Sequence, residues 1–358
     1  MPTAALPSTH PLVTGAVVGS PLLAAYAGGS PTRRPVWFMR QAGRSLPEYL
    51  DIRSGTQMLD ACRDPHLASE ITLQPVRRYG VDAAIFFSDI VVPMALAGVD
   101  VTIEPGIGPV FARPVRTMAD VESLPQLDET FDAALAPIRA AVSLTVSQLG
   151  ETPLIGFAGA PFTLAAYMVD GRASRDHLGA RRLIVTRPDV WAGLSEWVAR
   201  ASGAFLRAQV FAGASAVQLF DSWAGSLSAA QYEEACAPAS AAALAAVADL
   251  PVPRVHFAAN GSHLLRPMKE AGATVLGVDY RLPLDDAARL LGGNTPLQGN
   301  IDPALLSAPW DVLRAHVDDV LRRGEAAPGH VVNLGHGVPP DADPEVLLRI
   351  VEHVHSHG

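Results

Sequence analysis

The 358-residue sequence contains only two cysteines, Cys62 and Cys236, and a single lysine, Lys269. The cysteines lie far apart without CxxC spacing, so neither a disulfide framework nor a cysteine-rich zinc site is expected, and a reducing cytoplasm is the expected compartment. The one lysine lies in a pattern typical of a solvated helix face, which gives Schiff-base chemistry a poor candidate. Positive charge for binding an anion must therefore come from arginine.

Charged residues are also scarce, at 18% of the chain, and the formal net charge is -9 at pH 7. A nucleic-acid-binding protein would normally present a basic face, so nucleic acid is not an expected partner and any anion site must be local. No run approaches the roughly 20 apolar residues that span a bilayer, so no membrane partner is expected either. The hydrophobic fraction of 49% is enough for a large core.

The first part of the chain is apolar without being a convincing secretory signal, because no basic segment precedes residues 12–27 and prolines and glycines interrupt them. Ser20 followed by proline predicts an N-capped short helix over residues 20–26, which Gly28 and Gly29 end. We expect residues 1–19 to be a loose extension and residues 20–358 to form one domain, since no internal repeat or linker is present.

The remaining chain alternates between short apolar runs and alanine-rich helical stretches. Eight such runs predict an α/β fold of the (β/α)8 TIM-barrel type, with a doubly wound open sheet as the rival. The predicted strands cover residues 36–39, 83–88, 154–158, 216–220, 254–259, 275–278, 296–298 and 331–334. Polar or glycine-containing residues follow most of them, which favours the barrel, because barrel sites collect contributions from many strand ends. The proline-rich segment 91–125 is expected to include a hairpin.

Residues 35–49 place two arginines, Arg40 and Arg44, on a turn that follows the first apolar run. Each guanidinium offers a planar fork that matches a carboxylate or a phosphate, so the pair could converge on an anion. A solvated surface pair is the alternative that the spacing alone leaves open.

Four further side chains lie at or near strand ends. Asp89 could stabilise a cation or hold N–H donors, or it could cap the next segment. Tyr167 could face a ligand or belong to the core, while Ser222 lies outside a GxSxG elbow and is better interpreted as a hydrogen-bond donor. His336 is flanked by glycines that would let the backbone approach a ligand.

Metal and nucleotide sites have weaker support. The tail histidines His353, His355 and His357 could coordinate a metal, but surface histidines on a frayed helix are the favoured interpretation. No dinucleotide fingerprint or Walker loop is present, so nicotinamide cofactors are not supported and no metal is expected.

Taken together, these motifs resemble the uroporphyrinogen decarboxylase family. The first is Pro-Val-Trp-Phe-Met-Arg-Gln-Ala-Gly-Arg with Leu-Pro-Glu-Tyr, in residues 35–49. The others, in family order, are residues 86–90 (Phe-Phe-Ser-Asp-Ile), 156–164 (Gly-Phe-Ala-Gly-Ala-Pro-Phe-Thr-Leu), 218–222 (Gln-Leu-Phe-Asp-Ser), 297–300 (Leu-Gln-Gly-Asn) and 333–337 (Asn-Leu-Gly-His-Gly). Small departures at Ser45 and Phe162, where tyrosine and tryptophan are common, affect only local packing.

The resemblance implies a cofactor-free homodimer that removes CO2 from the four acetate side chains of uroporphyrinogen III, giving coproporphyrinogen III. It implies that Arg40 and Arg44 bind carboxylates and that Asp89 faces the pyrrole N–H groups, so these three are the expected catalytic residues. The expected substrate contacts are Arg40, Gln41, Ala42, Gly43, Arg44, Arg53, Phe86, Asp89, Tyr167, Phe220, Ser222 and His336.

Two other classes remain to be weighed. Zinc-dependent corrinoid or coenzyme M methyltransferases share this barrel but need a His-x-Cys pair, and Ala258 stands where that cysteine should follow His256. A non-catalytic tetrapyrrole carrier is the third class, although every expected catalytic position is filled.

Overall fold

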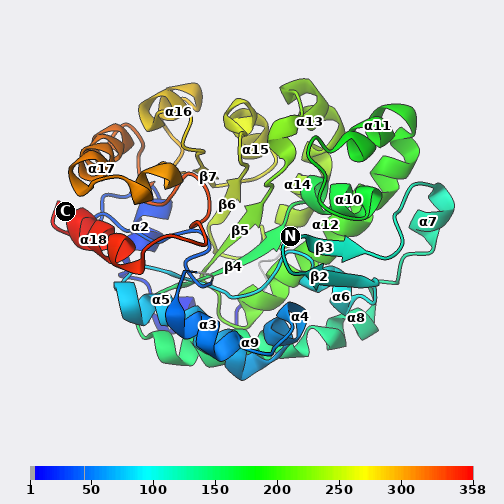
Figure 1. Ribbon diagram of the computed structural model, residues 1–358, viewed down its shortest axis with the longest axis horizontal. Helices are drawn as coiled ribbons and strands as arrows, with labels where there is room; N and C mark the ends of the chain where they lie inside the picture. The colour runs from blue at the N-terminus through cyan, green and yellow to red at the C-terminus, as the bar shows by residue number, and fades with distance from the viewer. Residues whose placement is uncertain (1–4, 44, 358) are drawn as a thin grey trace.

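The structure, a computed structural model, describes residues 5–43 and 45–357, so Arg44 lies outside the described residues. Its centre is a parallel sheet whose strands are neighbours in chain order (Figure 1). The strands are β1 (Ala84–Ile85), β4 (Leu154–Gly159), β5 (Ala216–Phe220), β6 (Arg254–Phe257), β7 (Val275–Gly277), β8 (Leu297–Gln298) and β9 (His330–Val331).

The first apolar run, residues 35–39, closes this sheet. Val36 forms a parallel bridge with Val332, and the Val332 N–H donates to the Pro35 carbonyl at 2.8 Å. On its other side the Asp82 N–H, just before β1, donates to the Val36 carbonyl at 2.9 Å. The run therefore lies between β9 and β1 as the eighth member of the barrel, which confirms the predicted fold class.

The side chain of Asp82 reinforces this closure. Its carboxylate has no solvent exposure and accepts hydrogen bonds from the Val36 N–H at 2.8 Å and from the Arg33 guanidinium at 2.6 and 3.1 Å. His355, near the end of the last helix, lies 2.7 Å from the same carboxylate. A buried carboxylate needs such partners, and here they join the two ends of the chain to the barrel.

Helices surround the barrel in Figure 1. The principal ones are α5 (Pro65–Tyr79), α9 (Ala136–Leu149), α12 (Pro188–Phe211), α14 (Ala237–Ala245), α15 (Leu265–Glu270), α16 (Leu284–Leu290), α17 (Trp310–Gly324) and α18 (Pro344–His355). The other helices are α1 (Pro11–Thr14), α2 (Pro21–Tyr26), α3 (Pro47–Arg53), α4 (Met58–Arg63), α6 (Val92–Leu96), α7 (Met118–Glu122), α8 (Glu129–Ala134), α10 (Pro161–Asp170), α11 (Leu178–Thr186) and α13 (Ala229–Ala235), with 3-10 turns at Ala224–Ser226, Ser262–Leu264 and Pro303–Ser307. None of the helices in the described chain is both long and apolar enough to cross a membrane.

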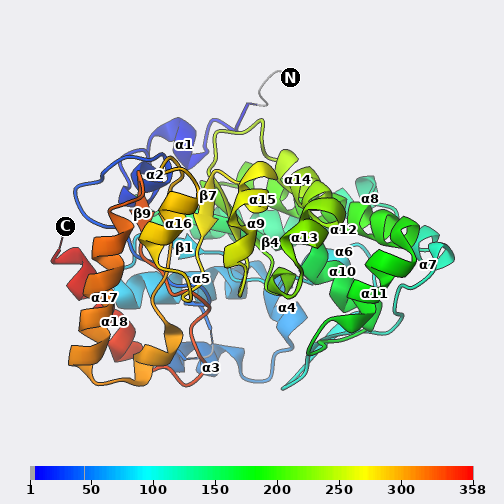
Figure 2. The same ribbon diagram turned by 90° about the horizontal axis from the view of Figure 1, so that it is seen from above.

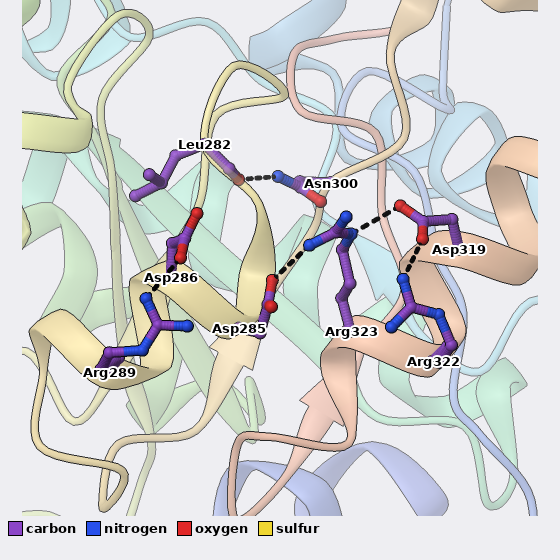
Figure 3. Close-up of polar contacts among 8 residues, drawn as sticks. All are labelled: Leu282, Asp285, Asp286, Arg289, Asn300, Asp319, Arg322 and Arg323. Atoms are coloured by element: carbon purple, nitrogen blue, oxygen red, sulfur yellow. Dashed lines mark hydrogen bonds and ion pairs between the residues drawn. The ribbon is translucent and has the colours of Figure 1, made fainter.

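Ion pairs fasten α16 to α17 on the outside of the barrel (Figure 3). Arg323 of α17 reaches Asp285 of α16 at 2.8 Å and Asp319 of its own helix at 2.6 Å. Nearby, the Asn300 amide donates to the Leu282 carbonyl at 2.6 Å. Surface pairs of this kind contribute about 0–1 kcal/mol each, so they orient the two helices more than they stabilise them.

An antiparallel hairpin forms within the long segment between β1 and β4, as the sequence predicts. It consists of β2 (Val101–Glu104) and β3 (Gly108–Phe111), with Glu104 paired to Gly108. Figures 1 and 2 place this region on the side of the barrel away from α17 and α18.

Within the segment expected to be a loose extension, residues 1–19, the described part includes a residue packed against the barrel. His10 is only 2% exposed, and its Nε2 lies 3.0 Å from the Val210 carbonyl of α12. Its Nδ1 accepts the Leu12 N–H and so caps α1. The following helix α2 is as predicted, capped by Ser20, and lies beside β9 in Figure 2.

A buried histidine at the start of β9 links stability to pH. His330 donates from Nε2 to the Gly299 carbonyl at 2.6 Å, and its Nδ1 accepts from Arg34 at 3.3 Å. Burial lowers the pKa of His330 from 6.5 to about 3, so the ring stays neutral in the folded protein. In the unfolded chain the same ring takes up a proton below pH 6.5, which favours unfolding there.

We therefore expect His330→Gln to lessen the acid sensitivity of the protein, because glutamine can keep a donor and an acceptor but does not titrate. Between pH 7 and pH 5 the wild type should lose about 2 kcal/mol of unfolding free energy through His330, and the variant should not. Denaturant titrations at both pH values measure this difference. The exposed His66→Gln is the control. If the unfolding free energy of His330→Gln fell between pH 7 and pH 5 as much as that of the wild type, His330 would not be the source of the acid sensitivity.

Candidate active site

One cavity of about 840 Å³ opens at the carboxyl ends of the barrel strands. Ten of the twelve expected substrate contacts line it, namely Arg40, Ala42, Gly43, Arg53, Phe86, Asp89, Tyr167, Phe220, Ser222 and His336. They come from chain positions almost 300 residues apart. The sequence shows only the order of the motifs along the chain, and the fold brings their residues together around one cavity. Of the other two, Arg44 lies outside the described residues and Gln41 lies beneath the cavity wall.

Arg40 occupies a left-handed backbone conformation, with φ of 62°. A non-glycine residue adopts this conformation only where its surroundings hold it. The Met39 N–H donates to Asn333 Oδ1 at 2.9 Å on one side, and a Cβ on Gly337 would lie 2.6 Å from Arg40 Cδ. The turn and the glycine together set where the guanidinium enters the cavity.

Gln41 is the residue that holds the turn from inside. It is fully buried, accepts the Phe38 N–H at 2.9 Å and donates to the Ala83 carbonyl at 2.9 Å. Both its amide atoms are thus used within the protein, and the side chain does not line the cavity. These bonds hold the segment next to Arg40, and the expected substrate contact from Gln41 stays a prediction.

Arg53 ends α3 and faces the cavity from another side. Its guanidinium carbon lies 5.6 Å from the centre of the Tyr49 ring, and its Nη1 lies against the Met58 sulfur. No ion pair to Arg53 is present among the described residues. Its charge is accordingly available for an anionic ligand.

Asp89 lines the cavity just beyond β1, before α6. Its Oδ1 accepts the Val91 N–H at 3.0 Å, so it does act as a local cap, one of the two alternatives that the sequence left open. The same carboxylate acts across the cavity, because its negative charge contributes to raising the pKa of Tyr167. Beneath it lies the Cys62 thiol, whose pKa is raised first by burial and then by the charge of Asp89. Asp89 thus accepts the local backbone hydrogen bond and also places its negative charge in the cavity.

Tyr167 is held in an aromatic stack. Its ring lies 3.9 Å from Trp223, which in turn lies 4.2 Å from His177 at an interplanar angle of 18°. Burial, followed by the charge of Asp89, raises the pKa of Tyr167 to about 12, and Arg40 opposes the shift. The phenol is therefore neutral near pH 7 and can donate a hydrogen bond into the cavity.

Aromatic rings supply part of the apolar lining of the cavity. Phe220 packs edge-on against Phe157 at 5.5 Å and against Phe257 at 6.4 Å, and all three line the cavity. Ser222 follows on the same strand end and supplies a hydroxyl. The chemistry of the lining thus suits a large ligand with an apolar body and anionic groups at its edge.

His336 stands at the mouth of the cavity. The surrounding walls lower its pKa by removing it from water, and the charge of Arg40 adds to this. Gly337 lines the cavity, so the expected approach of its backbone to a ligand stays a prediction. Both glycines are also required by the fold, because a Cβ on Gly335 would lie 2.2 Å from the Tyr280 backbone and one on Gly337 would lie 2.6 Å from Arg40 Cδ. They make room for the protein's own cavity wall.

Part of the site was not predicted. The tip of the β2–β3 hairpin, from Ile103 to Pro109, lines the cavity, and so do Phe157 and Phe257. The sequence offered one indication of Phe157 and Phe257: both lie in predicted strands, at positions whose side chains would face the inside of the barrel. The hairpin was predicted, but its reach toward the cavity depends on contacts distant in sequence.

The fold and the cavity together define a barrel enzyme that acts on a large, partly apolar organic anion. The family model described as Uroporphyrinogen decarboxylase (URO-D) matches residues 19–357. A protein named uroporphyrinogen decarboxylase from Arthrobacter sp. (strain FB24) is 66% identical over 342 residues, covering 96% of this chain and 98% of that protein. One of the same name from Leifsonia xyli subsp. xyli (strain CTCB07) is 60% identical over 370 residues, covering 98% of each. The chain belongs to the uroporphyrinogen decarboxylase family, as its motifs indicated.

Solved structures agree on the fold. A methyltransferase from Methanosarcina mazei superposes with a TM-score of 0.78, covering 94% of this chain and 97% of that chain, at 18% identity. At this identity the likeness concerns the fold alone.

The buried role of Gln41 leads to a stability prediction. Gln41→Leu leaves the Phe38 N–H and the Ala83 carbonyl without partners in the core, which should lower the unfolding free energy by roughly 2–4 kcal/mol. Chemical denaturation measures this loss. The matched control is Gln148→Leu on the exposed face of α9, where a change within about 0.5 kcal/mol is expected. An equally small change in the unfolding free energy for Gln41→Leu would contradict the structural role of these hydrogen bonds and would leave ligand contact as the role of Gln41.

Proposed function

We propose that this protein removes CO2 from the four acetate side chains of uroporphyrinogen III, giving coproporphyrinogen III in tetrapyrrole biosynthesis. The observation that carries the proposal is the convergence of Asp89, Arg40 and Tyr167 on one cavity in a chain of this family. We also propose, from the family resemblance, that the protein is a cytoplasmic homodimer. Its two cysteines, both buried and free, are compatible with a reducing compartment.

The substrate can serve as its own electron sink. A proton adds to the pyrrole carbon next to the one that bears the acetate, and the ring nitrogen stabilises the resulting cation. The electrons of the breaking carbon–carbon bond then move into the ring as CO2 departs, which leaves an exocyclic methylene. A proton adds to that methylene and another leaves the ring carbon, so each acetate consumes one proton and yields a methyl group and CO2. No separate cofactor is required by this chemistry.

Asp89 is proposed to stabilise the cationic ring. Its carboxylate is fixed by the Val91 N–H, so it can face the pyrrole N–H groups without reorganising as positive charge develops. Tyr167 and Ser222 would donate hydrogen bonds to the substrate from the neighbouring wall. His336 would contact substrate carboxylates at the cavity mouth.

The arginines are proposed to bind the carboxylates. Arg40 lines the cavity from the strained turn and Arg53 from α3. Arg44, which lies outside the described residues, is proposed as a third from the family resemblance. A guanidinium binds a carboxylate through two parallel hydrogen bonds, so each can orient an acetate or a propionate. Holding the departing carboxylate out of the ring plane would favour bond cleavage through alignment.

The methyltransferase alternative has little support in this structure. His256 is fully buried, Ala258 follows it where a cysteine would be needed, and Cys62 and Cys236 are both buried elsewhere. In the described part of the chain, no group of three histidine, cysteine or acidic ligands lies in the cavity. A thiolate zinc site therefore cannot be assembled there.

Anaerobic incubation with uroporphyrinogen, without added metal, tests the proposal. We expect the eight-carboxyl substrate to give a four-carboxyl product, with CO2 released in a ratio of four to one. Chromatography of the oxidised porphyrins counts the carboxyl groups. Binding of uroporphyrinogen with persistence of the eight-carboxyl species would favour a carrier and reject the decarboxylase.

The charge of Asp89 can be tested separately from its hydrogen bond. Asp89→Asn can still accept the Val91 N–H but carries no charge, so kcat should fall by about a hundredfold or more, on the order of 3 kcal/mol of transition-state stabilisation. Single-turnover decarboxylation measures this loss. Asp128→Asn is the control, because Asp128 accepts the Thr130 N–H in the same way, at the start of α8 and outside the cavity. Near wild-type turnover in Asp89→Asn would remove the charge from the mechanism.

A further inference from the structure

A second cluster of ligand atoms lies outside the cavity, where the end of α18 meets α17. Asp318 of α17 and two histidines, His353 and His357, place one oxygen and two nitrogens within 4.8 Å of one another. Across residues 5–43 and 45–357 this is the single group of three such side chains. The sequence pattern favoured ordinary surface histidines here, because it could not show that Asp318 lies opposite them.

The spacing and the contacts give the cluster a defined geometry. His353 lies in the last turn of α18, and His357 lies in the turn that follows the helix, where its ring centre is 4.2 Å from that of His353. Asp318 Oδ1 lies 2.6 Å from His353 Nε2 and 3.8 Å from His357 Nε2. The third tail histidine, His355, is turned away and bound to Asp82. The two remaining imidazoles thus share one carboxylate oxygen.

Hydrogen bonding selects the tautomer of His357. Its Nδ1 lies 2.8 Å from the His353 carbonyl, so Nδ1 carries the proton and donates it there. Nε2 is then left with a lone pair on the side of Asp318. A donated bond of this kind to a backbone carbonyl is the usual outer support of a metal-binding histidine.

Of the three side chains in the cluster, His353 is packed against the protein, and Asp318 and His357 remain accessible to solvent. The His353 side chain is 12% exposed and stands edge-on to the Trp310 ring at 5.7 Å. The nearby cation Arg349 lies over that ring at 4.0 Å, and Arg322 is paired with Asp319. Asp318 and His357 are 43% and 46% exposed, so an ion there could keep water ligands.

We propose that Asp318, His353 and His357 form a binding site for one divalent transition-metal ion of the zinc class. Two imidazole nitrogens and one carboxylate oxygen are ligands that Zn²⁺ accepts, with water completing the coordination. The ion would join α17 to the end of α18, two residues from the histidine that contacts Asp82. This site is separate from the decarboxylase cavity and does not depend on the function proposed for it.

Titration of the metal-free, untagged protein with Zn²⁺ tests the site. A chromophoric competitor should report one ion per chain with Kd in the micromolar range, and the thermal unfolding midpoint should rise as the site fills. Asp318→Asn and His357→Gln should each weaken binding at least about tenfold. The control is His66→Gln, an exposed histidine on α5, which should bind as the wild type does.

Co²⁺ gives an independent readout of the ligands. Because both thiols are buried away from the cluster, the bound ion should show weak d–d bands without a thiolate charge-transfer band. Circular dichroism of each variant checks that α18 is retained. Absence of saturable 1:1 binding would overturn the proposal, and so would equal affinity in the His357→Gln variant, since the ion would then lie elsewhere.

Discussion

The hydrogen bonds of the buried Asp82 carboxylate are the interaction on which the barrel depends. The segment that completes the circle, residues 35–39, makes only one bridge to β9, so ladder hydrogen bonds alone hold it weakly. Asp82 binds it twice, donating its own N–H to the Val36 carbonyl and accepting the Val36 N–H. A charge without solvent exposure is tolerated only with such partners, so the closure has essentially one arrangement. Because Arg40 follows four residues later, the same contact sets the position of the cavity wall.

From this fixed segment the chain enters a strained turn, and the strain is local. A left-handed residue costs about 1–2 kcal/mol relative to the ordinary helical conformation. Gln41 and Asn333 offset that cost with buried hydrogen bonds to Phe38 and Met39, the residues just before the turn, and Gln41 also donates to the Ala83 carbonyl. Gly337 leaves the space that the arginine stem occupies. The backbone and the stem of Arg40 are therefore held in the absence of a ligand, which limits where its guanidinium can lie and so favours positioning of a bound anion.

The barrel and most of the site could be predicted because both depend on local patterns. Apolar runs ending in polar residues predict strands whose carboxyl ends face a common cavity, and Asp89, Tyr167, Ser222 and His336 are found there. The contacts that the local patterns do not predict depend on distant partners. The polarity of Gln41 says nothing of the Ala83 carbonyl it reaches, and His10 is fixed by Val210, two hundred residues away. The glycines beside His336 indicate that some group lies close to the backbone there, but the sequence does not show that these groups are Tyr280 and Arg40.

The overall charge of the chain also says little about the charge of its ligand. On the surface, arginines such as Arg323 are neutralised by neighbouring carboxylates, here those of Asp285 and Asp319. Inside the cavity Arg53 instead contacts a thioether and an aromatic face, groups that leave its charge uncompensated. The low-dielectric phenylalanine wall opposite strengthens the field of such a cation. An acidic protein can therefore attract a polycarboxylate. Binding depends on the arginines inside the cleft that no carboxylate of the protein neutralises, and not on the net charge of the chain.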